Sequence, residues 1–109
     1  MDQINVAAVA DQLAEDGETE TELMREVSFS LRVMRFEPGD GDPMHAHAEE
    51  EIYFINTGEA TLVTEDETVE VASGDVVHLG SGADHQFPDF SDEFVVTVMY
   101  APAEGSQAV

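Results

Sequence analysis

Two of the four histidines in the sequence, His45 and His47, are separated by a single residue in the stretch HAHAEEE. In an extended strand, residues two apart point to the same face, so both imidazoles would face one point. Glu51 has the same parity and would add a carboxylate if the strand continues. A shift of one residue in the strand assignment would place a different glutamate on this face. His85 follows the turn-forming stretch GSGAD and would approach from a neighbouring strand. Nitrogen and oxygen donors in this combination are typical of transition-metal sites.

Spacing alone leaves a second interpretation open, because histidines near acidic residues also occur by chance on protein surfaces. Two further side chains are candidate catalytic groups. His78, in the stretch VVHL, titrates near neutral pH and would act as an acid or base if it lined the pocket, but a packing or rim position is the alternative. Tyr53 shares the strand parity of Glu51, so it is expected to face the interior, either in the pocket or in the core.

The acidic residues around these histidines have simpler expected roles. Glu49 and Glu50 are expected to be solvated side chains on the surface. Asp84 directly precedes His85, where it would either hydrogen-bond a ligand imidazole or serve the turn.

The apolar residues that must position this site change their period along the chain. Residues 6–16 carry valine, alanine and leucine at helical spacing, which predicts a short helix. From Val27 the period becomes two, and Pro38 and Gly39 end this first strand. Further short β-rich runs follow at 51–56, 60–65, 68–72, 76–79 and 94–100, separated by turn signals. This pattern predicts an all-β, antiparallel barrel or sandwich.

Composition narrows the functional classes. The chain has 109 residues, which is enough for one compact domain. It contains no cysteine, so a metal must be bound by nitrogen and oxygen. Its 25 acidic residues against three arginines give a formal charge of −22, which argues against binding to nucleic acid or to anionic membrane surfaces. Because the acidic residues are spread evenly, we expect a protein adapted to the cytoplasm of a salt-accumulating halophile.

The stretch from Gly39 to Gly58 resembles the first motif of the cupin superfamily, G-x5-HxH-x3-E-x6-G, with every fixed position filled. The stretch from Gly74 to Asp89 resembles the second motif, G-x5-PxG-x2-H-x3-N. There, Gly80 replaces the proline and Asp89 replaces the asparagine, both at turn positions that tolerate these residues.

The resemblance implies a double-stranded β-helix, or jelly-roll, barrel. It predicts a lead-in segment at 1–27 with a short helix and a first strand, a cupin barrel at 28–101 and a flexible tail at 102–109. It also implies that His45, His47, Glu51 and His85 bind one divalent ion of Fe, Mn, Ni, Cu, Co or Zn. Such a ligand set leaves one or two positions open for water or substrate.

Three functions are compatible with this site. The first is a metal-dependent oxidoreductase, dioxygenase-like, acting on a small neutral or aromatic substrate. The second is a sugar isomerase or epimerase, which the negative field disfavours for phosphorylated substrates. The third is a non-catalytic module that binds a metal or small molecule. The apolar run 94–100 and the small size of the barrel also predict a homodimer.

Overall fold

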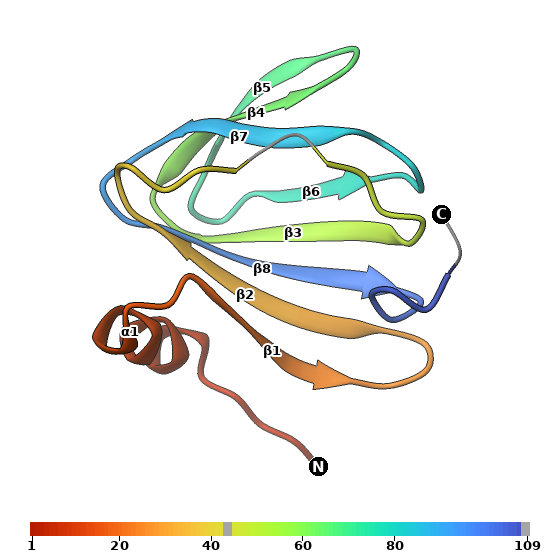
Figure 1. Ribbon diagram of the computed structural model, residues 1–109, viewed down its shortest axis with the longest axis horizontal. Coiled ribbons are helices and arrows are strands. Elements are labelled where there is room, and N and C mark those ends of the chain that lie inside the picture. Colours follow the sequence, from red (N-terminus) through yellow and green to blue (C-terminus); the bar gives the residue numbers. More distant parts are fainter. Residues whose placement is uncertain (43–44, 108–109) are drawn as a thin grey trace.

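The computed structural model describes residues 1–42 and 45–107, and these fold into two facing antiparallel sheets with a helix packed outside one of them (Figure 1). The five-stranded sheet has the order β1-β2-β8-β3-β6, and the three-stranded sheet has the order β5-β4-β7. This is the double-stranded β-helix that the cupin resemblance implies, and its antiparallel strands agree with the pattern of the sequence. The elements are α1 (Val6–Asp16), β1 (Glu20–Arg25), β2 (Ser30–Phe36), β3 (Glu50–Thr57), β4 (Glu59–Thr64), β5 (Thr68–Ala72), β6 (Val76–Leu79), β7 (His85–Phe90) and β8 (Phe94–Ala101).

Helix α1 forms where the sequence predicts it and covers the outer face of the larger sheet. The Asn5 side chain caps its first turn by accepting a hydrogen bond from the backbone N–H of Ala8 at 2.9 Å. Gly17 ends the helix in the left-handed conformation. The buried side chains of Ala10 and Leu13 pack against β2 and β8. Each end of the helix is therefore set by a local capping residue.

Strand β2 begins later than the apolar alternation predicts, at Ser30 instead of Val27. The backbone N–H of Glu26 donates to the carbonyl of Phe29, which closes a turn between β1 and β2 and leaves Val27 91% exposed. Along β2, Val33 faces helix α1, whereas Met34 faces the barrel interior. Because the helix covers the outer face, both faces of this strand are buried in its middle.

The barrel interior is divided into an apolar half and a polar half. Phe36, Phe87, Phe90 and Phe94 form an aromatic cluster at one end, with ring centroids 5.1 to 6.2 Å apart. Tyr53 joins the two halves, because its ring packs edge-on against Phe87 at 5.4 Å while its hydroxyl points to the polar half. Tightly packed aromatic rings exclude water from one end of the barrel.

Gly58, the last glycine of the first motif, lies at a close approach between two turns. Its φ of 88° is in the left-handed region, and a side chain there would collide with the carbonyl oxygen of Glu93. The β3–β4 turn therefore requires glycine, which explains this motif position by its backbone geometry.

The residues after β8 contact the barrel through several hydrogen bonds. Ala103 is buried, and the backbone N–H of Glu104 donates to Oγ of Ser30 at 2.9 Å. The N–H groups of Gly105 and Gln107 donate to the two carboxylate oxygens of Glu49 at 3.0 and 3.1 Å. These contacts attach residues 103–107 to the end of the barrel, where the sequence predicts a flexible tail. The predicted domain boundaries stay a prediction.

Among the described residues, no helix is long and apolar enough to cross a membrane.

Candidate metal centre

The backbone around the histidines is held by pairing between the segment before β3 and the start of β7. His45 and His85 exchange both backbone hydrogen bonds, at 3.0 and 2.9 Å. The N–H of Gly82 donates to the carbonyl of His47 at 2.7 Å. Since β3 begins only at Glu50, the strand that our parity argument assumed at 45–47 is instead an isolated bridge followed by a bend. Long-range pairing, and not strand continuity, brings these histidines to β3.

The side chains of His45, Glu51 and His85 lie together inside the polar half of the barrel. One donor atom from each residue lies within 4.8 Å of the other two. Glu51 is 1% exposed, and among the described residues its Oε1 has no hydrogen-bond partner. A buried carboxylate oxygen without a partner is costly unless a cation binds it. The three side chains therefore fit a divalent transition metal.

Two hydrogen bonds orient His85. Its Nδ1 lies 2.9 Å from the carbonyl oxygen of Ala83, and because a carbonyl only accepts, Nδ1 carries the proton. Burial lowers the pKa of His85, which favours the neutral ring. Nε2 then accepts from the hydroxyl of Tyr53 at 2.9 Å and lies 3.4 Å from Oε2 of Glu51. The backbone thus presents the unprotonated nitrogen of His85 to the carboxylate.

His47 lies beside this group but outside the 4.8 Å cluster. Its Nε2 is 3.9 Å from Oε1 of Glu51, and its ring centroid is 5.3 Å from that of His45. Burial lowers the pKa of His47 and keeps it available as a neutral donor. The structure therefore brings three of the four predicted ligands together and places the fourth next to them. The complete four-residue set stays a prediction.

The carboxyl group of Glu51 is strongly perturbed. Its pKa is raised to about 8, first by burial and next by the negative charge of Glu104. A cation that binds this carboxylate would reverse the effect and favour the ionised form.

The two catalytic candidates have different positions. Tyr53 is 1% exposed and contacts His85 through its hydroxyl, so it belongs to the site. His78 does not. It pairs with Ile52 on the outer face of the sheet, and its side chain is 59% exposed and lies 2.8 Å from Oε1 of Glu50. The pocket role considered for His78 is therefore wrong, because strand parity points the ring away from the barrel interior.

One prediction for the acidic residues is also corrected. Glu49 is not solvated: it is buried, because both of its carboxylate oxygens accept backbone N–H groups from the C-terminal residues. The carbonyl of Ala83 accepts the hydrogen bond from Nδ1 of His85, so the carboxylate of Asp84 does not accept it. Of the two roles considered for Asp84, the turn role remains. Glu50 is exposed as predicted.

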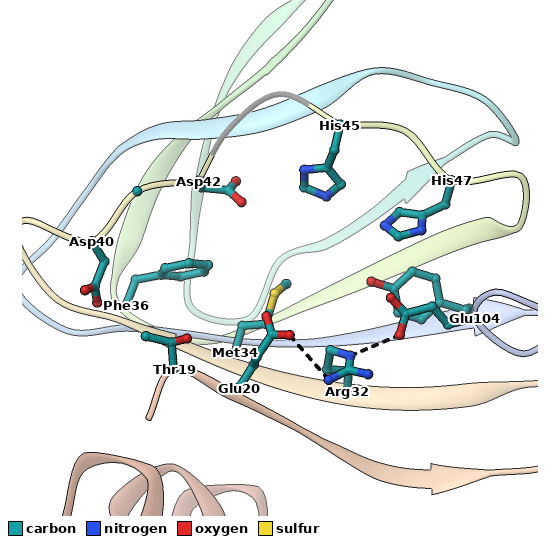
Figure 2. A pocket seen from close by; sticks show the side chains of 12 residues that line it. Thr19, Glu20, Arg32, Met34, Phe36, Asp40, Asp42, His45, His47 and Glu104 are labelled. Carbon is teal, nitrogen blue, oxygen red and sulfur yellow. Dashed lines mark hydrogen bonds and ion pairs between the residues drawn. The ribbon is translucent and has the colours of Figure 1, made fainter. Parts of the chain in front are cut away.

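A cavity of about 360 Å³ lies beside the histidines, and both His45 and His47 line it (Figure 2). Tyr100 also lines it, with its ring 5.0 Å from that of His47. Arg32, from β2, and Glu104, from the C-terminal residues, form an opposite part of the wall.

Sequence reasoning missed these cavity residues. Arg32 lies two residues from Met34 along β2, and this shared parity is the signal that would have placed it inside. Glu104 carries no local signal, because its position depends on hydrogen bonds to Ser30 and Arg32 that are distant in sequence.

A cupin domain family model matches residues 32–100 of the chain. An uncharacterized protein of Streptomyces coelicolor is 33% identical over 95 residues, which cover 87% of this chain and 90% of that protein. Thr19, Glu20 and Glu104, which line the cavity, lie outside the residues that the family model matches.

Solved structures of other proteins have similar folds. An RmlC-like cupin family protein with a double-stranded β-helix fold from Methanocaldococcus jannaschii has a TM-score of 0.68 and 22% identity, with 77% of this chain and 81% of that chain covered. DMSP lyase DddQ from Ruegeria pomeroyi DSS-3 has a TM-score of 0.73 and 26% identity. The match covers 88% of this chain but 52% of the lyase, so the chain corresponds to about half of that protein.

Proposed function

The chain belongs to the cupin family, and from this premise we propose that it is a metal-dependent oxidoreductase, dioxygenase-like, acting on a small organic substrate without negative charge. The observation that carries the proposal is the cluster of His45, Glu51 and His85. Two histidines and one carboxylate are the ligand set of non-haem iron(II) oxygenases, in which the remaining coordination positions are open.

The proposed cofactor is one divalent transition ion per chain, of Fe, Mn, Ni, Cu, Co or Zn. His45, Glu51 and His85 would bind it, with His47 as the fourth predicted ligand. A redox-active ion at this place would supply oxygen activation and Lewis acidity. The absence of cysteine is consistent with this nitrogen and oxygen donor set.

Residues of the chain itself would control protons and water around the ion. Burial raises the pKa of Tyr53, so its hydroxyl stays protonated and donates. This hydroxyl is within reach of a group bound next to His85, which makes Tyr53 the candidate proton donor. The packed rings of Phe87 and Phe94 close the barrel behind Tyr53, so solvent reaches the site from the cavity side.

The cavity supports the size and charge of the substrate in this proposal. Its volume of about 360 Å³ suits a small molecule. Arg32 lines it but is surrounded by the carboxylates of Glu20, Glu22 and Glu104, so it offers little charge to a phosphate or carboxylate. A sugar phosphate isomerase would need a cationic side chain that is free to bind the phosphate group.

Lyase chemistry is the second candidate. The structural match to a DMSP lyase supports it, and the hydroxyl of Tyr53 beside His85 would provide proton transfer for an elimination. Elimination differs from dioxygenation because it consumes no oxygen.

Oxygen uptake tests the choice. We would load the protein with iron(II) and measure uptake across a panel of catechols, flavonols and thiols, with the Glu51→Gln variant beside it. Substrate-dependent uptake that is lost in Glu51→Gln supports the dioxygenase. Product formation from an organic substrate without uptake supports the lyase, and uptake that persists in Glu51→Gln contradicts the proposed site.

A further inference from the structure

We propose that the cavity beside the metal centre selects substrates that carry a positively charged organic group, and that Glu104 and Glu20 provide this selectivity. The inference rests on the proposed function, because it places the cationic group next to the metal ligands. It refines the substrate from a molecule without negative charge to an organic cation such as a quaternary ammonium compound.

The charges that line the cavity are predominantly negative. Glu20, Asp40, Asp42 and Glu104 contribute carboxylates, whereas Arg32 is the one arginine among the described lining residues, which include no lysine. Carboxylates on several sides of a partly enclosed cavity raise the local concentration of cations.

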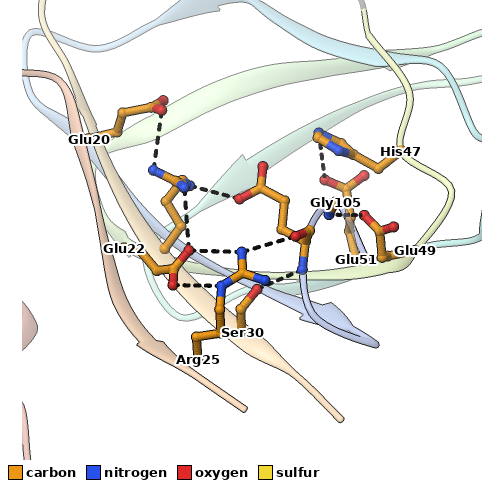
Figure 3. Close-up of polar contacts among 10 residues, drawn as sticks. Glu20, Glu22, Arg25, Ser30, His47, Glu49, Glu51 and Gly105 are labelled. Carbon is orange, nitrogen blue, oxygen red and sulfur yellow. Dashed lines mark hydrogen bonds and ion pairs between the residues drawn. The ribbon is translucent and has the colours of Figure 1, made fainter. Parts of the chain in front are cut away.

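The charge of Arg32 is already balanced inside the protein. Its Nε lies 3.0 Å from Oε1 of Glu104, and one terminal nitrogen lies 3.4 Å from Glu20 (Figure 2). The other terminal nitrogen lies 3.7 Å from Glu22, which is also paired with Arg25 at 2.9 and 3.0 Å (Figure 3). Arg32 is therefore left to balance the two lining carboxylates of Glu20 and Glu104, and their sum is negative. A substrate anion would have to compete with all three for Arg32, whereas a cation would gain from the excess.

Hydrogen bonds hold the backbone of Glu104 in place. Its backbone N–H donates to Oγ of Ser30 at 2.9 Å, and its carbonyl accepts from Nη2 of Arg25 at 2.9 Å. The next residue, Gly105, donates to the buried carboxylate of Glu49. A carboxylate with a fixed backbone and a fixed partner loses little entropy when it binds a ligand.

Aromatic and sulfur-containing side chains also line the cavity. Phe36 and Met34 come from β2 (Figure 2). Tyr100 comes from β8. Aromatic rings combined with carboxylates are the surroundings in which quaternary ammonium groups are bound, through cation–π and Coulomb attraction.

The acidic lining is tied to a binding site by an independent observation. Glu51 is 1% exposed, and its Oε1 has no hydrogen-bond partner in the described part of the chain. It forms the metal cluster with His45, which also lines the cavity. The carboxylates therefore line a cavity that shares His45 with a site of unused ligand capacity, unlike the acidic residues spread over the rest of the surface.

A pair of probes that differ only in charge tests this inference. We would titrate the full chain with choline and with its neutral carbon analogue, 3,3-dimethylbutan-1-ol, at fixed ionic strength, following the aromatic and histidine resonances by NMR. The expected result is that choline binds about tenfold more tightly than the neutral analogue. Glu104→Gln and Glu20→Gln are each expected to remove most of this preference.

The matched control is Glu15→Gln, on the exposed surface of helix α1, because it changes the net charge equally and is not among the described residues that line the cavity. It is expected to leave the preference unchanged. Equal binding of the two probes, binding of neither at millimolar concentration, or an equal loss in Glu15→Gln would each overturn the inference. Because binding is measured without turnover, a choline preference in a protein that shows no oxygen uptake would count against the dioxygenase and leave this inference standing.

Discussion

The hydroxyl of Tyr53 donates a hydrogen bond to Nε2 of His85 at 2.9 Å, so the nitrogen that would bind a metal is already in use as an acceptor. A metal ion and the hydroxyl must compete for this single lone pair.

Replacement of Tyr53 by phenylalanine should therefore separate metal binding from folding. Without the hydroxyl, Nε2 of His85 is buried without a partner, which should lower the stability of the metal-free protein by about 1–3 kcal/mol. Zinc affinity should be unchanged or up to about fivefold higher, because the competing bond, worth roughly 1 kcal/mol, is gone. Chemical denaturation and zinc titration would measure both. Weaker zinc binding in Tyr53→Phe would show that the hydroxyl supports the bound ion.

The raised pKa of Glu51, about 8, predicts how the metal-free protein responds to pH. The folded protein keeps a proton that the unfolded chain, at the ordinary value of 4.5, has already lost. Between pH 4.5 and about 8 the folded state therefore binds more protons, so this contribution to stability is present below pH 4.5 and is lost as the pH rises to about 8. Denaturation curves across this range should show the decline in wild type but not in Glu51→Gln. An identical decline in both proteins would contradict it.

Metal binding should have the opposite pH dependence. Because the carboxyl proton of Glu51 must leave before the ion binds, affinity should rise about tenfold per pH unit up to about pH 8. Competition titrations with a buffered chelator at several pH values would measure the slope, and a flat profile from pH 6 to 8 would rule out this proton release.

Glu49 is predicted to hold the C-terminal residues at the cavity. Its two oxygens accept the N–H groups of Gly105 and Gln107. Glu49→Ala should leave these groups unpaired, cost about 1–3 kcal/mol and increase hydrogen exchange at residues 103–107. Glu50→Ala is the matched control, since its exposed carboxylate contacts only the outward-facing His78 in the described hydrogen bonds. Equal exchange in the two variants would argue against the anchor.

The charge of the chain predicts that stability increases with salt. The three arginines lie next to glutamates, so most of the 25 acidic residues have no cationic partner among the described contacts. Salt screens their mutual repulsion, and melting temperatures should rise from low to molar KCl. A melting temperature independent of salt would contradict the adaptation to high salt that we expect.

Local patterns predicted most of the fold. Short β-rich runs bounded by turn signals located β3 to β6 and β8, and the spacing of Val6, Ala10 and Leu13 located the helix. Strand parity correctly placed Tyr53 in the interior. What local pattern could not predict depends on contacts between distant segments.

Three features show this dependence on long-range contacts. The backbone pairing of His45 with His85 replaces the strand assumed at the HxH sequence. Glu49 is buried because it accepts a hydrogen bond from Gly105, which is 56 residues away in sequence. Glu104 reaches the cavity through Ser30 and Arg32, which are 74 and 72 residues distant. None of these contacts is encoded in a short stretch of sequence.

Metal content is the measurement that tests the central claim most directly. We would determine metals by elemental analysis on untagged protein purified in high salt without chelator, for wild type, Glu51→Gln and His78→Ala. The proposed site predicts about one Fe, Mn, Ni, Cu, Co or Zn ion per chain in wild type and in His78→Ala, whose ring faces outward, and a loss of the ion in folded Glu51→Gln. No bound metal in wild type, or an ion retained by Glu51→Gln, would contradict it.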